Sequence, residues 1–264
     1  MLTRDAVVER LRAAGCVYAE DEADVILATA ASPEELAAML TRRADGAPLE
    51  QVVGWAELCG VRVQVDADVF VPRRRSELLV REAAAAARSV TGRRPLVVDL
   101  CCGTGAVGLA VVAQVDAELH AADVDPTAVA CARRNLERAG ATVHIGDLFE
   151  ALPGSLRGRV DVLVVNAPYV PTDEIRLLPV EARDHEARVA LDGGVDGVAL
   201  HRRVAAGARA WLAPGGALLI ETSERQEPLT GAAVRSGGLA VTSALDDDLE
   251  AWVVIGRRAR DVRE

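Results

Sequence analysis

Residues 97–111 read VVDLCCGTGAVGLAV, which is an apolar run, a glycine-rich turn and a second apolar run. This order predicts a β-strand, a tight turn and the start of a helix, because glycine lets the backbone turn sharply and lets a ligand approach the helix N-terminus. Gly103, Gly105 and Gly108 also match the GxGxxG pattern of dinucleotide-binding turns. Taken alone, this pattern does not separate a nicotinamide cofactor from S-adenosylmethionine.

From Pro95 onward the chain repeats this alternation of short apolar strands and helices. The rhythm is typical of a doubly wound, Rossmann-like α/β sheet buried on both faces, here with about seven strands. The last two strands are too close in sequence for a parallel crossover, so the last strand should run antiparallel. We expect strands at 96–100, 117–122, 141–145, 160–165, 216–221, 239–243 and 251–256, and helices at 126–139 and 197–212.

The chain before the sheet has a different pattern. Its first part has helical spacing, and residues 58–71 alternate in the manner of a β-hairpin, with the turn near Asp66-Ala67-Asp68. Ser76 is expected to cap the alanine-rich helix that follows. The chain therefore divides into a helical module at 1–56, a β-hairpin linker at 57–75 and an α/β domain at 76–264.

Composition excludes several classes of protein. All 30 basic residues are arginine, which excludes a Schiff-base lysine, a lysine base and a P-loop. The net charge of −10 disfavours direct binding of nucleic acid. No apolar run approaches the roughly 20 residues of a membrane helix, and the N-terminus does not resemble a signal peptide. We expect a cytoplasmic monomer with reduced cysteines and, because the histidines lack ligand spacing, no metal.

Acidic residues close three successive strands of the expected sheet. Asp99 ends the first strand, where it is placed to receive an ammonium group through water or backbone. Asp123 ends the second strand, where a carboxylate would bind two ribose hydroxyls. Asp147 ends the third, where it would accept from an adenine amino group while Leu148 packs on the ring. A role in a turn or as a helix cap would explain any one of these acids equally well. Together they favour S-adenosylmethionine, which is cationic and rich in donors.

The fourth strand ends in Asn166-Ala167-Pro168-Tyr169, at the sheet edge where ligands bind in such folds. The Asn166 side-chain oxygen and the Ala167 carbonyl can each accept a hydrogen bond from one NH2 group, which orients that nitrogen toward a methyl donor. Pro168 stiffens the turn, and Tyr169 can stack on a planar group. An ordinary Asn-x-Pro turn is the structural alternative.

Several segments together resemble one known family. DLCCGTGAVGLA, AADVDP, GDLF and NAPY occur in the order and spacing of the glutamine-modifying protein methyltransferases, which carry NPPY at the last position. PLEQVVGWAELCGVRVQVDADVFVPRRRSELLV and EARDHEARVALDGGVDG resemble further segments of that family. The resemblance runs from roughly residue 48 to the end of the chain, and its combined motifs are specific.

The resemblance implies a class I S-adenosylmethionine methyltransferase that modifies a glutamine of a peptide chain release factor, and hence a role in translation termination. It implies that Asn166 to Tyr169 hold the target amide and that the helical module helps to bind the protein substrate. The residues that it implies for contact with S-adenosylmethionine are Cys101, Cys102, Gly103, Thr104, Gly105, Asp123, Leu148 and Asn166.

The chain departs from the family pattern at three places. Ala167 replaces the first proline of NPPY, which keeps the carbonyl acceptor but removes about 0.4–1 kcal/mol of pre-organisation. Cys101 replaces a glycine. Arg73-Arg74-Arg75 replaces a segment in which the family has a proline and an acid, and the added positive charge could change the partner.

Other functions stay open at this stage. Enzymes that methylate a nucleobase or a small molecule on nitrogen use a similar NPPY motif to hold the target nitrogen. Ala167 also leaves open an inactive S-adenosylmethionine-binding protein. A nicotinamide oxidoreductase rests on GxGxxG alone, without an evident acid or base for hydride transfer.

Overall fold

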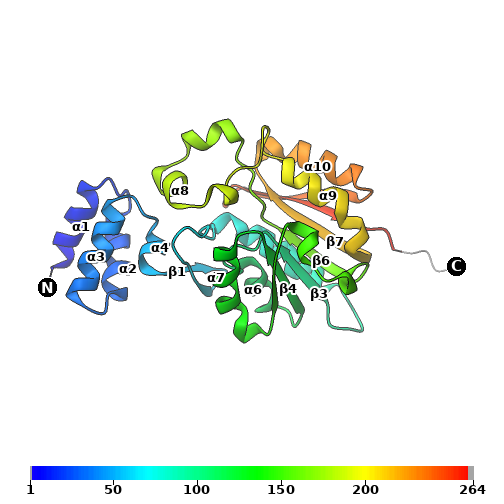
Figure 1. The fold of residues 1–264 in the computed structure, drawn as a ribbon, viewed down its shortest axis with the longest axis horizontal. Coiled ribbons are helices and arrows are strands. Elements are labelled where there is room, and N and C mark those ends of the chain that lie inside the picture. Colours follow the sequence, from blue (N-terminus) through cyan, green and yellow to red (C-terminus); the bar gives the residue numbers. More distant parts are fainter. Residues whose placement is uncertain (1, 261–264) are drawn as a thin grey trace.

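The computed structural model describes residues 2–260, which form a helical module joined to a larger α/β domain (Figure 1). The module comprises four helices: α1 (Arg4–Ala13), α2 (Ala19–Thr29), α3 (Pro33–Ala44) and α4 (Leu49–Val53). Their apolar faces enclose a separate core that includes Leu11, Ile26 and Leu40. None of the helices within residues 2–260 is long and apolar enough to cross a membrane.

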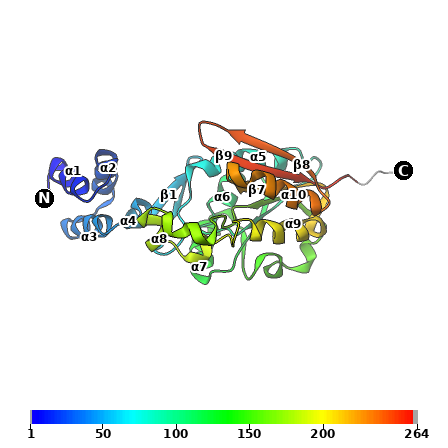
Figure 2. The ribbon, with the colours of Figure 1, turned by 90° about the horizontal axis from the view of Figure 1, so that it is seen from above.

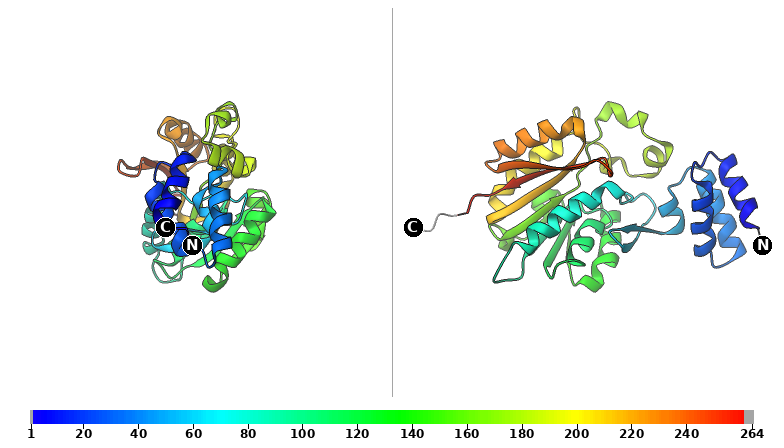
Figure 3. Two further views of the ribbon diagram at one scale, coloured as in Figure 1. Left: turned by 90° about the vertical axis from the view of Figure 1, so that its left-hand side faces the viewer. Right: turned by 180° about the vertical axis from the view of Figure 1, so that it is seen from behind.

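Polar contacts attach the module to the α/β domain. The Gln51 side chain is buried and its Nε2 donates to the carbonyls of Val69 and His185 at 3.1 and 3.0 Å. Arg43 is buried as well, and it pairs with Glu22 of the module and with Glu181 of the α/β domain. Figures 2 and 3 show the module at one end of the molecule.

A two-stranded antiparallel hairpin, β1 (Trp55–Leu58) and β2 (Val61–Gln64), follows the module. The expected position of its turn was wrong. The chain reverses at Cys59 and Gly60, whose φ angles of 51° and 75° suit a tight hairpin turn. Asp66-Ala67-Asp68 instead lies in irregular backbone beyond the hairpin.

The α/β domain is built on a seven-stranded sheet, which confirms the expected fold class. The strand order is β5-β4-β3-β6-β7-β9-β8, and β9 is antiparallel to both neighbours while the other pairs are parallel. The bounds are β3 (Leu96–Leu100), β4 (Glu118–Asp123), β5 (Thr142–Ile145), β6 (Val160–Val165), β7 (Leu212–Thr222), β8 (Ala240–Asp246) and β9 (Ala251–Arg257).

Helices cover both faces of this sheet, as Figure 3 shows. Val97 and Val162 face a core that contains α5 (Glu77–Arg88), α6 (Ala106–Val112) and part of α7 (Pro126–Leu136). Val98 and Leu163 face a second core that contains α9 (Ala199–Trp211) and α10 (Glu227–Ser236). Burial on both faces is the reason that these strands read as continuous apolar runs. One further helix, α8 (Val180–His185), lies between β6 and α9 in sequence.

Candidate functional site

A cavity of about 640 Å³ opens at the carboxyl ends of the parallel strands. The loops after β3, β4, β5 and β6 line it, together with residues 68–76 and 178–191. The strand order changes direction here, because β4 and β6 flank β3 on opposite sides, and such a point is where ligands bind in doubly wound folds. Its volume suits a small organic cofactor together with part of a substrate.

The structure brings almost all of the predicted site residues to this cavity. The exception is Gly105, where an added Cβ would lie 2.9 Å from a methyl group of Leu136 on α7. Gly105 therefore allows the turn to pack against α7 and does not line the cavity. The residues that do line it are Asp99, Cys101, Cys102, Gly103, Thr104, Asp123, Asp147, Leu148, Asn166, Ala167, Pro168 and Tyr169.

The turn after β3 is closed by Asp123 from the neighbouring strand. Asp123 Oδ2 accepts from the Gly103 amide at 2.9 Å, and Oδ1 accepts from the Asp125 amide at 3.0 Å. Burial raises the pKa of Asp123 above its ordinary value. Asp125 caps α7 through the Thr127 amide, as Ser or Asp does at many helix starts. The Asp123 carboxylate thus fixes the turn and faces the cavity at the position expected for ribose binding.

Cys101 occupies a backbone position that favours glycine. Its φ is 56°, in the left-handed region that side chains with a Cβ rarely adopt. Holding a non-glycine residue there costs on the order of 1 kcal/mol. Burial raises the pKa of the Cys101 thiol above its usual range, so the thiol is neutral and is no nucleophile.

Asp99 lies deeper than the other acids. It is only 2% exposed, and its Oδ2 accepts from the Gly108 amide of α6 at 2.9 Å. Gly108 suits this approach, because an added Cβ would lie only 3.0 Å from Oδ2. Burial, aided by the charge of Asp123, raises the pKa of Asp99 to about 7.

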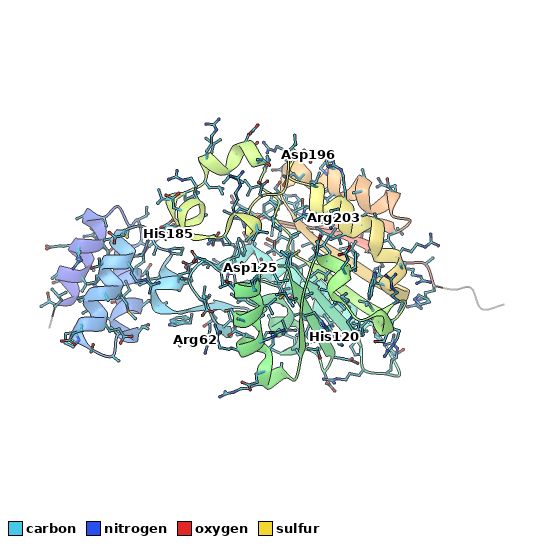
Figure 4. The ribbon with its side chains drawn as sticks, viewed as in Figure 1. Arg62, His120, Asp125, His185, Asp196 and Arg203 are labelled. Carbon is cyan, nitrogen blue, oxygen red and sulfur yellow. The ribbon has the colours of Figure 1, made fainter. Side chains whose placement is uncertain are left out.

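The turn after β5 carries Asp147 and Leu148. Asp147 Oδ2 accepts from the Arg203 guanidinium of α9 at 2.7 Å, which the sequence analysis did not foresee. Leu148 is 9% exposed and has a φ of 50°. Figure 4 shows Asp125 and Arg203 near the middle of the domain and His120 away from them, on β4. His120 stacks with His144 outside the cavity lining.

Asn166 follows β6 and makes a contact that changes the interpretation of Ser76. The Asn166 Nδ2 atom donates to the Ser76 hydroxyl at 3.2 Å. The expectation that Ser76 caps α5 was wrong, because its side chain makes no capping hydrogen bond. Ser76 is 1% exposed, and it lies close enough to Glu221 of β7 to lower the pKa of that carboxyl group. Ser76 is therefore a site residue that sequence reasoning missed.

A glycine-rich loop supports the backbone of Tyr169. Gln226 Nε2 donates to the Tyr169 carbonyl at 2.7 Å. An added Cβ on Gly197 would lie 2.3 Å from that carbonyl oxygen, and one on Gly193 would lie 2.7 Å from the Tyr169 Cα. This close approach explains the glycines of LDGGVDG, which hold the NAPY segment against the rest of the domain.

Charged side chains form the wall of the cavity nearest to the helical module. Glu186 is buried, and its Oε1 accepts from the Val71 amide at 3.1 Å and from Arg73 at 2.6 Å. Arg75 is exposed at the cavity rim. Burial and the neighbouring Glu221 raise the pKa of Tyr169, so its hydroxyl stays protonated at neutral pH.

Replacing Asp123 by alanine should mainly weaken cofactor binding. The change removes an acceptor for the cofactor hydroxyls and releases the Gly103 amide, and each hydrogen bond to a charged group is worth about 1.5–3 kcal/mol. We expect a loss of about 2 to 3 kcal/mol, or roughly 30- to 150-fold in Kd. Titration calorimetry with S-adenosylhomocysteine measures it. Asp116→Ala, at a remote and exposed acid, is the control, and a change below about threefold at Asp123 would contradict the assignment.

Known proteins with similar sequences are methyltransferases. Residues 74–194 match the family model "Methyltransferase small domain". A release factor glutamine methyltransferase of Geobacter sulfurreducens is 37% identical over 86% of this chain and 80% of its own length. A 4-amino-L-phenylalanine/4-methylamino-L-phenylalanine methyltransferase of Streptomyces pristinaespiralis is 34% identical over 86% of this chain and 78% of its own length.

A solved structure confirms the fold. The 16S rRNA N2 G1207 methyltransferase of T. thermophilus, in complex with S-adenosylmethionine and guanosine, superposes with a TM-score of 0.53. The two chains are 20% identical, and the matched region covers 77% of this chain and 49% of the T. thermophilus chain. The cavity has the acids, the glycine turn and the volume that S-adenosylmethionine requires, so the residues present fit this cofactor. The protein is an S-adenosylmethionine-dependent methyltransferase, and it belongs to the family of the release factor glutamine methyltransferases.

Proposed function

We propose that this enzyme methylates the side-chain amide nitrogen of a glutamine residue in a peptide chain release factor. The observation that carries the proposal is the position of Asn166 and Ala167, which share one cavity with the glycine turn and Asp123. Its relatives include a release factor glutamine methyltransferase, which indicates the substrate. The NAPY segment provides the two acceptors that a primary amide requires. A release factor substrate would place the enzyme in the cytoplasm.

Two acceptors would orient the target amide. The Asn166 Oδ1 and the Ala167 carbonyl each accept one hydrogen of the substrate NH2 group. Bound S-adenosylmethionine supplies a methyl group on a positively charged sulfur. As the new N–C bond forms, the bond between sulfur and methyl would break and a neutral thioether would leave. The two acceptors would stabilise the positive charge that grows on nitrogen, and one of the two hydrogens would be lost to water as a proton. Tyr169 lines the cavity beside them and packs on the planar amide.

The replacement of proline by Ala167 leaves this chemistry in place. Ala167 is 1% exposed, so its backbone is held by the surrounding core. The Gln226 and Gly197 contacts to Tyr169 hold the same segment from the other end. These contacts replace part of the rigidity that a second proline would have added.

The helical module is proposed to contact the protein substrate. Val17 and Tyr18 at the start of α2 are 84% and 70% exposed, in a chain with few aromatic residues. A second cavity of about 390 Å³ lies beside Tyr18, and it shares Arg73 and Glu181 with the lining of the first. A polypeptide that crosses the second cavity would therefore reach the first.

Transfer of a labelled methyl group tests the proposal. The enzyme is incubated with methyl-labelled S-adenosylmethionine and a release factor, and the labelled residue is located by mass spectrometry. We expect the label on one glutamine and none on a release factor in which that glutamine is replaced by glutamate. Label on added RNA would support a nucleic-acid substrate instead. Cofactor binding without transfer to any acceptor would support an inactive binding protein.

A small aromatic amine is the second candidate substrate. The Streptomyces relative acts on 4-amino-L-phenylalanine, and it covers as much of this chain as the Geobacter enzyme does. Arg75 at the cavity rim would bind the carboxylate of such an amino acid. Adding 4-amino-L-phenylalanine to the same assay decides between the two, because label on this amine and none on the release factor would favour the small molecule.

A further inference from the structure

Two buried polar side chains, Ser76 and Glu221, lie next to the half-buried Asn166 of the candidate amide-binding segment. Ser76 directly precedes α5, Asn166 follows β6, and Glu221 lies in β7. Val165 is paired with Ile220 in the sheet, so Asn166 and Glu221 are the next residues on adjacent parallel strands. Ser76 and Glu221 are each 1% exposed. Of the three, only Asn166 contacts the target amide in the proposed function.

The hydrogen bonds among these groups have a defined direction. Asn166 Nδ2 donates to Ser76 Oγ at 3.2 Å. A serine hydroxyl has one hydrogen, and while its oxygen accepts from Asn166 that hydrogen is available to a second acceptor. The Glu221 carboxylate has no donor of its own when ionised, and Ser76 is close enough to it to lower its pKa. We therefore assign this carboxylate as the acceptor of the hydroxyl hydrogen. The direction is therefore from the Asn166 amide to the Ser76 hydroxyl and on to the Glu221 carboxylate.

This direction decides which atom of Asn166 faces the substrate. A side-chain amide can rotate by half a turn, which exchanges its oxygen with its NH2 group. With the oxygen toward the substrate, Asn166 accepts a hydrogen of the target nitrogen. With the NH2 group toward the substrate, two donors would face each other and the target nitrogen would lose an acceptor. A carboxylate behind Ser76 favours the first arrangement, because Ser76 must then accept from Asn166.

We propose that Ser76 and Glu221 are positioning residues that hold Asn166 with its side-chain oxygen toward the target nitrogen. The proposal rests on the proposed amide or amine substrate for its catalytic consequence, but the orientation of Asn166 is a property of the protein alone. Glu221 has a second feature that fits this role. Its Oε2 is buried without a hydrogen-bond partner among the described residues, so part of the carboxylate is free to accept a hydroxyl hydrogen.

A matched pair of variants isolates the hydroxyl group. Ser76→Thr keeps the hydroxyl and Ser76→Val has the same shape without it, so any strain from the added methyl group is common to both. At pH 8, above the pKa of about 7 to which burial raises Glu221, we expect kcat of Ser76→Val to be roughly 10- to 100-fold below that of Ser76→Thr. The KM for S-adenosylmethionine should differ by less than about threefold. Equal kcat values would overturn the proposal.

A double variant tests whether Glu221 acts through Ser76. Glu221→Gln keeps the shape of the side chain and removes the charge, and we expect kcat to fall by about three- to tenfold. In the Ser76→Val background the same change should have no further effect, because the connection to Asn166 is already broken. If kcat of the double variant instead fell by the product of the two single effects, Glu221 would act independently of Ser76.

Hydrogen exchange tests the orientation without a substrate. The side-chain NH2 resonances of Asn166 are assigned by their loss in Asn166→Asp. We expect their exchange to be at least about tenfold faster in Ser76→Val than in Ser76→Thr, because the hydroxyl acceptor is absent. Equal exchange rates would contradict the relay. If the parent enzyme transfers no methyl group to either candidate substrate, the proposed function fails while this measurement still decides the orientation.

Discussion

Asn166→Ala should reduce methyl transfer by about 10³-fold while leaving the affinity for S-adenosylmethionine within about tenfold. In the proposed mechanism the side-chain oxygen is one of the two acceptors that orient the target nitrogen, and alanine cannot replace it. The Ala167 carbonyl alone allows the amide to rotate, so its lone pair no longer points at the methyl donor. We expect cofactor binding to depend mainly on the turn after β3, which Asp123 holds through the Gly103 amide and which this change does not touch.

Single-turnover kinetics and titration calorimetry on the same preparation separate the two quantities. Asp123→Ala is the opposite control, because it should weaken binding more than it slows the step within the bound complex. A rate for Asn166→Ala within about tenfold of the parent would mean that positioning comes from other residues. A loss of cofactor affinity equal to the loss of rate would mean that Asn166 belongs to the cofactor site.

Residues at the ends of the strands were predictable because parallel strands end at the same edge of a sheet. Asp99, Asp123 and Asn166 each follow an apolar run that sequence reasoning identified, and the topology then brings them together. Their exact environments were not predictable. Nothing in the local sequence distinguishes Asp99, which is 2% exposed, from the more accessible Asp123.

Residues that act across long sequence separations were missed. Ser76 lies 90 residues before Asn166, and its position before an alanine-rich helix is the usual signature of a cap. Glu186 bonds the Val71 amide 115 residues away. These contacts depend on how α5 and the segment around α8 pack over the sheet. The pattern of apolar residues in the sequence does not predict that packing. An acid that ends the apolar run GALLIE was the one available signal for Glu221.

The hairpin shows a different kind of failure. Tight hairpin turns need positive φ at their central residues, and the sequence offered Cys59-Gly60, in which cysteine is an unusual residue for this role. Asp66-Ala67-Asp68 had the more usual composition of a turn. The strand that precedes it ends at Gln64, whose amide and carbonyl both bond the Asn135 side chain of α7. A tertiary contact, and not a local turn signal, therefore sets the end of β2.

Stability should depend on pH through Asp99. Burial raises its pKa to about 7 in the folded protein, whereas an aspartate in the unfolded chain titrates near its ordinary value of 3.8. Between these values the folded state binds more protons than the unfolded state, so the free energy of unfolding falls as pH rises. The contribution is fully present below about pH 4 and is lost above about pH 8, for a total of about 4 kcal/mol.

Asp99→Asn removes this titration and keeps an oxygen for the Gly108 amide. Relative to the parent, the cofactor-free variant should therefore gain about 3 kcal/mol of stability between pH 5 and pH 8, measured by urea unfolding. Asp116→Asn, at an exposed acid, should show no such trend, and a constant difference for Asp99→Asn would contradict the raised pKa. The same variant should bind S-adenosylmethionine less tightly at pH 8, because only an ionised Asp99 attracts the ammonium group. On this account the ionised Asp99 lowers the stability of the cofactor-free protein, and in return it strengthens the binding of S-adenosylmethionine.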